Sequence, residues 1–150
     1  MMDATDRTIL ALLQADGSLS NATLGQAVGL SASGVNDRLQ RLRGQRVIIG
    51  STVRIDPTKI DLSVLAFISV LIDWSEHNEA FSAAVKGMSE VLECHHVTGD
   101  WSYLLKVRTR DNYALEELIS NRIKALPGVT RSETIFAVGT DKETTVLPLD

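Results

Sequence analysis

An apolar spacing inside residues 19–54 constrains the fold of this chain more than any other feature. Val35, Leu39 and Leu42 recur at i, i+4 and i+7, so they fall on one face of a helix that Ser31 is well suited to cap. The opposite face of the same helix is polar. The segment therefore predicts an amphipathic helix that buries one side and leaves the other side available to a partner.

A second, shorter helix is predicted immediately upstream, where Ser20 can cap it. The apolar positions of this helix, at i, i+3 and i+4, are Leu24, Ala27 and Val28. Gly29–Ser31 joins the two helices, and a further helix over about Thr5–Ala15 packs behind them. Two helices joined by a tight glycine-containing turn form a helix-turn-helix, whose second helix enters the DNA major groove.

The polar face of the second helix carries side chains that donate hydrogen bonds to base edges and phosphates. Helix geometry assigns base contacts to Ser33, Asn36 and Gln40, and backbone contacts to the arginines. The predicted DNA-binding residues are Ser31, Ser33, Asn36, Arg38, Gln40, Arg41 and Arg54.

The whole chain has a net charge of −4 at pH 7, but this total hides an asymmetry. Residues 1–60 hold seven basic and five acidic side chains, whereas residues 61–150 hold eight and fourteen. Five arginines lie between Arg38 and Ile55 without a carboxylate, so the local field favours phosphate. Asp37 either accepts a hydrogen bond from a cytosine amino group or, as the favoured interpretation, pairs with Arg38 or Arg41. The alternative to a DNA-binding domain is a small helical bundle whose arginines are simply solvated.

Residues 47–55 are rich in β-branched side chains around a Gly50-Ser51 turn, which predicts a small two-stranded wing. Asp56-Pro57 ends this segment, because proline lacks a backbone donor and restricts the residue before it. We therefore predict a winged helix-turn-helix domain over residues 1–56, a linker over about 56–61 and a second domain over residues 62–150.

Beyond residue 61 the apolar spacing becomes alternating, which indicates strands. Leu62–Ile72 is apolar on both faces, so it is an inner strand or an edge strand completed by a partner chain. The remaining predicted elements are a helix over about 75–88, strands over 91–98 and 102–108, a helix from Asp111 to Leu126, and a strand over 129–138. This β-α-β-β-α-β order predicts an α+β, ferredoxin-like fold with two helices on one sheet face. The free apolar face implies an oligomer.

Composition and motifs exclude several classes of protein. Hydrophobic residues make up 44% of the chain, yet no apolar run approaches the ~20 residues that cross a bilayer. The N-terminus lacks the layout of a signal peptide, and the single Cys94 cannot form an internal disulfide. These features predict a cytoplasmic protein with no membrane partner. Glycine-rich phosphate loops, HExxH and Gly-x-Ser-x-Gly are absent from the sequence, so we do not expect an enzyme.

A cluster of potential metal ligands raises the alternative of a metal sensor: Cys94, His95, His96, Asp100 and His77. On a strand, Cys94 and His96 share one face while His95 points the other way, so at most two ligands converge from that run. A metal site shared between two chains is the remaining possibility. Histidines that are hydrogen-bonded or exposed to solvent explain these residues more simply. We therefore predict no metal and no other cofactor.

An ordered series of short motifs runs through the chain from end to end. These are Asp6 with Ile9-Leu10, Leu12-Leu13-Gln14-Ala15-Asp16-Gly17, Val28-Gly29-Leu30-Ser31, Arg38-Leu39, Arg41-Leu42, Val47-Ile48 with Gly50, Asp56-Pro57, Val97-Thr98-Gly99-Asp100, Tyr103-Leu104-Leu105, Leu126-Pro127-Gly128-Val129 and Leu147-Pro148-Leu149. The series resembles the Lrp/AsnC (leucine-responsive/asparagine-responsive) family of feast-or-famine transcription regulators. No single piece is diagnostic, but the ordered set with these spacings is highly specific.

The resemblance implies a sequence-specific, DNA-binding transcriptional regulator of amino-acid metabolism, associated with the nucleoid in the cytoplasm. It also implies dimers made by pairing sheets, often assembled into tetramers or octamers, with a small effector such as an amino acid bound between dimers. Carried over onto this sequence, the effector site comprises Thr98, Gly99, Asp100, Trp101, Ser102 and Tyr103, with Glu133, Thr134 and Phe136 from a neighbouring subunit.

Two regions depart from the family pattern. Many relatives carry an acidic residue where this chain has Ser102, and further basic or apolar residues where it has Asn36, Asp37 and Gln40. The N–H groups of a glycine turn can hold a carboxylate, but Ser102 offers no charge to an ammonium group. One possibility is that Asp100 contacts the ammonium group of the ligand, and another is that the ligand preference has changed. In the third, no effector binds and the turn is an ordinary hairpin. An effector-independent architectural DNA-binding protein is therefore the alternative function.

Overall fold

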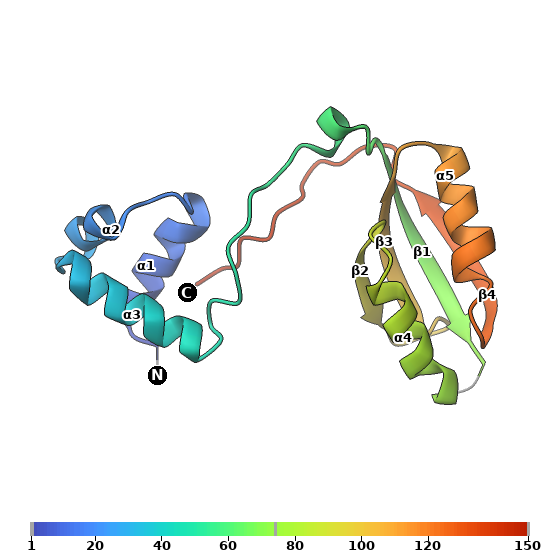
Figure 1. Ribbon diagram of the computed structural model, residues 1–150, viewed down its shortest axis with the longest axis horizontal. Helices are drawn as coiled ribbons and strands as arrows, with labels where there is room; N and C mark the ends of the chain where they lie inside the picture. The colour runs from blue at the N-terminus through green and yellow to red at the C-terminus, as the bar shows by residue number, and fades with distance from the viewer. Residues whose placement is uncertain (1, 74, 150) are drawn as a thin grey trace. The chain divides into compact units, whose positions relative to one another are not determined.

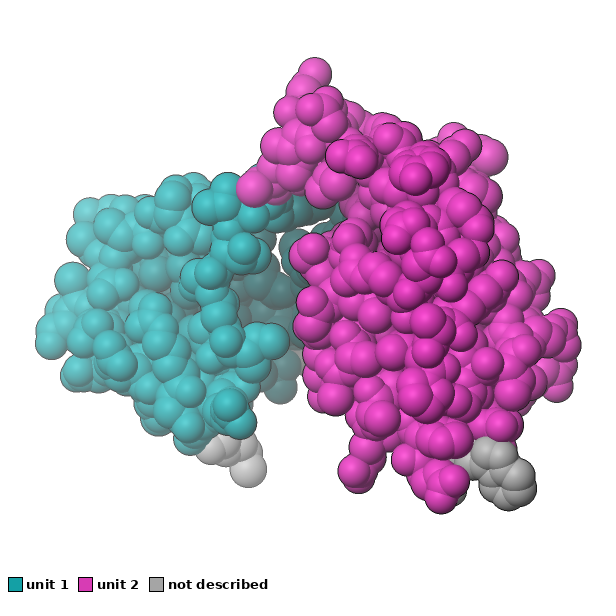
Figure 2. Space-filling view, turned by 45° about the vertical axis from the view of Figure 1, so that its right-hand side comes forward, with its two compact units in different colours: residues 1–54, 142–150 teal, residues 55–141 magenta. Residues whose placement is uncertain are grey.

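A computed structural model describes residues 2–73 and 75–149 of the chain. The chain divides into two compact units: unit 1, residues 1–54 with 142–150, and unit 2, residues 55–141 (Figure 2). Residues 142–150 fall in unit 1, whereas the sequence places them in the second domain. The Gln14 amide donates to the Leu147 carbonyl (3.0 Å) and accepts from the Leu147 N–H (2.7 Å), so the tail pairs with unit 1.

Unit 1 contains the three helices that the sequence predicts. They are α1 (Ala4–Ala15), α2 (Asn21–Val28) and α3 (Ala32–Gly44) (Figure 1). The predicted caps are present, since the Ser20 and Ser31 hydroxyls accept the N–H groups of Thr23 and Gly34, both at 3.1 Å. Gly29, at φ +70°, ends α2 in the left-handed region and starts the turn into α3. The helix-turn-helix is therefore confirmed.

A small apolar core joins these helices. Its buried residues are Ile9, Leu24, Val35 and Leu39, and Leu42 is also buried. The predicted inward position of Ala27 is wrong, because Ala27 is exposed. Instead Gly25 is buried, and a Cβ there would collide with the Leu30 carbonyl. The α2 helix turns its glycine inward because only glycine permits this close approach to the following turn.

Residues 47–56 do not form the predicted wing, because none of them lies in a strand. Ile49 is 93% exposed and Val53 is 80% exposed. β-Branched side chains favour strands only where a neighbouring strand and a packed face are available, and a lone two-stranded hairpin is marginal in water. The winged form of the domain is thus wrong for the single chain, whereas the helix-turn-helix is not affected.

Unit 2 has the predicted order of strands and helices. Its elements are a short 3₁₀ helix (Pro57–Ile60), β1 (Val64–Ile72), a second 3₁₀ turn (Ser75–His77), α4 (Asn78–Lys86), β2 (Val91–His96), β3 (Tyr103–Thr109), α5 (Asn112–Glu117), a π-helical continuation (Leu118–Ile123) and β4 (Val129–Phe136). The antiparallel sheet has the order β2-β3-β1-β4 (Figure 1). The predicted second helix is thus α-helical only in its first part. The wider turn that follows brings Leu118, Ile119 and Ile123 together in the core.

The helices α4 and α5 cover one face of the sheet (Figure 1). Ala66, Ile68 and Val70 of β1 point toward them and are completely buried. The strand register places a second set of side chains on the opposite face, which we call the open sheet face. It consists of Leu65, Phe67, Ser69, Leu71, Glu93, His95, Leu104, Lys106, Arg108, Arg131, Glu133 and Ile135. In residues 2–73 and 75–149, no helix has the length and apolar character needed to cross a membrane.

Candidate functional site

The solvent-facing side of α3 is the candidate DNA-binding surface. Ser33, Asn36 and Gln40 are exposed and follow one another at i, i+3 and i+7, as predicted from the helical spacing. Asp37 is exposed on the same side. Its predicted pairing with Arg38 or Arg41 is wrong, because both arginines reach a different carboxylate.

That carboxylate belongs to Asp6 in α1, which is completely buried. Arg38 Nη1 lies 2.8 Å from one oxygen of Asp6, and Arg41 Nη2 lies 2.7 Å from the other. Arg38 Nη1 also contacts Asp3 at 2.7 Å, while the Asp3 and Asp6 side chains accept each other's backbone N–H groups. We call these four residues the Asp6 ion cluster. It ties the start of α1 to the middle of α3.

The electrostatics of the cluster follow from its contacts. Burial alone would raise the pKa of Asp6, but hydrogen bonds from the Asp3 N–H and from both guanidinium groups outweigh burial and lower this pKa to about 2. The Arg38 hydrogen bond likewise lowers the pKa of Asp3. At neutral pH the carboxylates are therefore charged, and the cluster orients α3 through charge-assisted hydrogen bonds.

Two further predicted DNA contacts also have intramolecular roles. The Ser31 hydroxyl caps α3, and Arg54 Nη2 donates to the Glu143 carbonyl at 3.0 Å in the C-terminal tail. In contrast, Arg43 and Arg46 are exposed, and we find no ion pair for them within the described residues. Arg43 follows Asn36 by seven residues and Gln40 by three, so it shares their side of α3. Both belong to the basic run between Arg38 and Ile55 but are not among the predicted DNA-binding residues.

The turn between β2 and β3 carries the predicted effector residues. Gly99 has φ +100°, in the left-handed region, and Thr98 and Asp100 are exposed. The turn is closed by a hydrogen bond from the Val97 N–H to the Ser102 carbonyl (3.1 Å). An exposed glycine turn that carries an exposed carboxylate, that of Asp100, is thus present on this surface.

Ser102 and Tyr103 attach this turn to the rest of unit 2. The Ser102 N–H donates to the Val70 carbonyl (2.9 Å), and the Ser102 hydroxyl accepts the Ile72 N–H (3.0 Å). Tyr103 is buried, with its ring 4.8 Å from that of Phe81, and burial raises its pKa. The side chains of both residues therefore serve the fold of this chain.

The predicted residues of β4 do not meet the turn within one chain. Thr134 and Phe136 pair with Ile68 and Ala66 on the helix-covered face, whereas Glu133 lies on the open sheet face. Phe136 is opposite Ala66 and the turn is attached at Ile72, six residues along β1, which corresponds to about 20 Å. Any contact between Phe136 and this turn requires a second copy of the chain.

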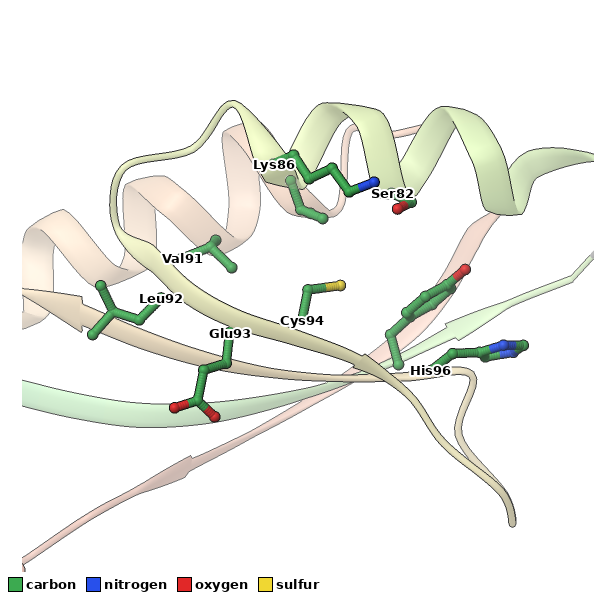
Figure 3. A pocket seen from close by; sticks show the side chains of 9 residues that line it. Ser82, Lys86, Val91, Leu92, Glu93, Cys94 and His96 are labelled. Carbon is green, nitrogen blue, oxygen red and sulfur yellow. The ribbon is translucent and has the colours of Figure 1, made fainter. Parts of the chain in front are cut away.

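A groove of about 470 Å³ lies between α4 and β2 (Figure 3). Ser82 and Lys86 line it from the helix, and Cys94 and His96 line it from the strand, whereas Glu93 points away from α4 (Figure 3). Burial raises the pKa of the Cys94 thiol, so the unreactive protonated form prevails at neutral pH.

The potential metal ligands are separated by strand alternation, as predicted. Cys94 and His96 face α4, with the His96 ring stacked on Tyr103 at 4.9 Å, whereas His95 faces the other side beside Glu93 (3.2 Å). Among the described residues, no three His, Cys, Asp or Glu side chains converge as a metal site.

Comparison with known proteins agrees with both halves of this structure. The sequence model of the AsnC-type helix-turn-helix domain matches residues 2–43, and that of the Lrp/AsnC ligand binding domain matches residues 65–147. The chain is 39% identical over 135 residues to the leucine-responsive regulatory protein of Salmonella typhimurium, covering 89% of this chain and 82% of that protein. The leucine-responsive regulatory protein of Escherichia coli K12 is 38% identical over the same coverage.

Solved structures show the same fold. A transcriptional regulator from Neisseria meningitidis, in complex with L-Met, has a TM-score of 0.95 and 32% identity, covering 100% of this chain and 98% of the other. The feast or famine regulatory protein from M. tuberculosis, complexed with L-methionine, has a TM-score of 0.90 and 29% identity, with 98% and 99% coverage. Two matching domain models in the right order, together with these relatives, show that the chain belongs to the Lrp/AsnC family of transcriptional regulators.

Proposed function

We propose that this regulator reads double-stranded DNA with the exposed side of α3 and responds to a small amino acid at the Thr98–Tyr103 turn. The single observation that supports DNA reading best is the exposed polar row on α3 beside exposed arginines. Ser33, Asn36 and Gln40 contact base edges in this proposal, and Arg43 and Arg46 contact phosphates. Arg38 and Arg41 act mainly by orienting α3 through Asp6.

Salt dependence of DNA binding separates these roles. Replacing Arg43 with Gln should lower the slope of log affinity against log salt by about one on a random-sequence duplex, because one phosphate contact is lost. Replacing both Asn36 and Gln40 with Ala should leave that slope unchanged and alter the sequences enriched by selection from a random pool. Arg41→Gln should lower the melting temperature of unit 1 as well as DNA affinity. An unchanged slope for Arg43→Gln would remove Arg43 from the phosphate contacts.

The proposed effector is a free amino acid, because two family members with this fold were solved with L-methionine. The exposed turn at Gly99 offers N–H groups for a carboxylate, and Asp100 offers a charge for an ammonium group. Glu133, Thr134 and Phe136 of a neighbouring subunit complete the site in this proposal. A thermal-shift panel of the twenty amino acids tests it, since a ligand at 100 times its Kd adds about 2.7 kcal/mol and raises Tm by a few degrees.

The open sheet face supports a proposed homodimer made by sheet pairing. Ile135 is 58% exposed on this face and pairs with partly buried Phe67, and partly buried Leu71 lies on the same face. Apolar side chains on a sheet face that no helix covers are typical of an interface. Light scattering after gel filtration should give a dimer, a tetramer or an octamer for the natural chain and a smaller mass for Ile135→Asp. A monomer at micromolar concentration would contradict this proposal. Localisation to the cytoplasmic nucleoid would follow from DNA binding by such oligomers.

Ser102 supports a second candidate, an architectural protein that wraps DNA without any effector. Its hydroxyl already accepts the Ile72 N–H, so it bonds within the fold where many relatives offer a charged group. Absence of any thermal shift across the amino-acid panel, combined with intact DNA binding, would favour this function over the effector-responsive one.

A further inference from the structure

The groove between α4 and β2 does not correspond to any site predicted from the sequence (Figure 3). Of the predicted effector residues only Tyr103 lines it, and no residue of the turn at 97–102 does. Cys94 and His96 border the groove from the helix-covered side of the sheet, opposite to the open sheet face. Its volume of about 470 Å³ is in the range of small-molecule sites. The groove is thus a candidate site separate from the turn and from the proposed dimer surface.

Tyr103 is the most informative residue of this groove. Its side chain is only 6% exposed, yet within residues 2–73 and 75–149 its hydroxyl has no hydrogen-bond partner. In this described part of the chain, every fully buried side-chain nitrogen or oxygen has a partner, so the Tyr103 oxygen must reach the surface, and the surface that Tyr103 lines is the groove. Burial raises the pKa of Tyr103, so the hydroxyl is protonated at neutral pH. The ring serves the fold, whereas the hydroxyl is a donor that lacks an acceptor.

The other polar groups of the groove are also donors. Ser82 and Lys86 project from α4 and His96 projects from β2 (Figure 3). Within the described residues, no hydrogen bond or ion pair engages these three side chains. Glu93 borders the groove as well, but it points away from α4 (Figure 3), and its carboxylate is paired on the open sheet face. A hydroxyl, an ammonium group and an imidazole without an opposing carboxylate favour an anion over an ammonium-bearing ligand.

The walls of the groove favour a planar, apolar body for this anion. Val85 and Val91 supply apolar surface. The His96 ring is exposed and stacks on Tyr103, with ring centroids 4.9 Å apart and planes inclined by 23°. Tyr103 in turn contacts the buried Phe81 ring, at 4.8 Å. An exposed ring that is supported in this way offers a flat surface on which a further ring can stack.

We propose that the groove between α4 and β2 binds a small aromatic carboxylate, whose ring lies against His96 and whose carboxylate accepts hydrogen bonds from Tyr103 and Lys86. The inference goes beyond the proposed function, because this ligand needs no ammonium group and no residue of the turn at 97–102. Unit 2 then has a second small-molecule site, for a second class of ligand.

Calorimetry on the full chain with benzoate and benzamide tests this assignment, because the two probes share the ring and only benzoate is charged. Benzoate should bind with a Kd below about 1 mM and roughly tenfold more tightly than benzamide. Tyr103→Phe keeps the ring and removes only the unpaired hydroxyl, so it should weaken benzoate binding about 3- to 10-fold without lowering Tm. Lys86→Gln should abolish the preference for benzoate. Tyr113→Phe and Lys124→Gln are the matched controls, since both residues are exposed in the same unit and lie outside the groove.

Each contrary result overturns the inference in a distinct way. A Kd for benzoate above about 1 mM would remove the site and leave the proposed binding of DNA and amino acids as it stands. Equal binding of benzoate and benzamide would remove the carboxylate contacts. Unchanged benzoate affinity in both Tyr103→Phe and Lys86→Gln would place the probe outside the groove. A loss in Tyr103→Phe alone would assign the probe to the neighbouring turn, because Lys86 lies on α4.

Discussion

Unit 1 is organised around a buried carboxylate, whereas unit 2 is organised around a larger, mainly apolar core. In unit 1 the compact core cluster has four buried residues, and the Asp6 ion cluster supplies the remaining link between α1 and α3. In unit 2 the core cluster has fourteen buried residues between the sheet and its two helices. A small core needs directional contacts to fix the orientation of its helices, and a large core does not.

This difference matches what each unit must do. A recognition helix needs a defined orientation, because base contacts depend on ångström-scale placement. In the proposed function, the sheet of unit 2 supports a turn that binds a ligand and an open face that binds a second copy. We therefore expect unit 1 to respond to charge and pH, and unit 2 to respond to changes in packed volume.

The largest effect should come from the centre of unit 2. Ile68 is completely buried in an inner strand, so Ile68→Ala should lower the free energy of unfolding by about 2–5 kcal/mol, against about 0.5–1.5 kcal/mol for the control Ile68→Val. Urea unfolding followed by tryptophan fluorescence reports on this unit, because both tryptophans lie within residues 55–141. A loss below about 1 kcal/mol for Ile68→Ala would contradict the role of this core.

Asp6→Asn should have the next largest effect, and it should be confined to unit 1. The amide keeps the shape of the side chain but removes the charge that faces Arg38 and Arg41, so we expect a loss of roughly 1–3 kcal/mol. Hydrogen exchange of the backbone amides of α1 and α3 measures this loss of stability separately from that of unit 2. Asp37→Asn is the control, because it changes the same charge at an exposed position of α3. Equal effects of both variants would show that net charge, and not the cluster, matters.

Lowering the pH should reduce the stability of unit 1 over a defined pH range. The pKa of Asp6 is about 2 in the folded chain, below its ordinary value of 3.8, so the unfolded chain binds a proton first as the pH falls. The contribution of Asp6 to the free energy of unfolding is therefore complete above about pH 4 and is lost as the pH falls to 2. The difference in melting temperature of unit 1 between the natural chain and Asp6→Asn should shrink over this window. A constant difference would contradict the low pKa of Asp6.

Local spacing predicted much of this structure. The serine caps, the buried stripe of α3 and the order of strands and helices each depend on residues a few positions apart, and all are confirmed. The wing failed because β-branched residues predict a strand only when a partner strand is present. The pairing of Leu147 with Gln14 was not predicted for a related reason, since it joins residues that are far apart in the sequence.

The Asp6 ion cluster could have been found in the sequence. Asp6 precedes Ile9 and Leu10 by three and four residues, so the helical spacing places a carboxylate on the buried side of α1. A buried carboxylate requires a cation or several donors, and Arg38 and Arg41 were available one turn apart. No such pattern pointed to the groove between α4 and β2, because its donors come from a helix and two strands that only the fold brings together.

A modest gain in stability should come from replacing Gly44, at the end of α3. A Cβ at this position would meet nothing within 4 Å, so Gly44→Ala should raise the stability of unit 1 by about 0.5–1 kcal/mol through helix propensity. Combined with Asp6→Asn it should recover part of the lost stability without restoring orientation of α3. Thermal unfolding followed by circular dichroism measures the recovery, and DNA affinity of the double variant should stay low. Recovery of DNA affinity along with stability would show that the ion cluster acts only by stabilising the unit.

The smallest effect on stability should come from Ile49, in the segment that follows α3. Ile49 is 93% exposed and contributes no packed area, so Ile49→Thr should change the free energy of unfolding of the dilute monomer by less than about 0.5 kcal/mol. The threonine keeps the β-branched shape and removes only apolar surface. The same measurement repeated at high protein concentration, where oligomers form, tests whether this segment acquires a partner strand. A loss that grows with concentration would show that the wing expected from the sequence forms only between chains. A constant, small effect would leave residues 49–55 as an extended segment outside the core of unit 1.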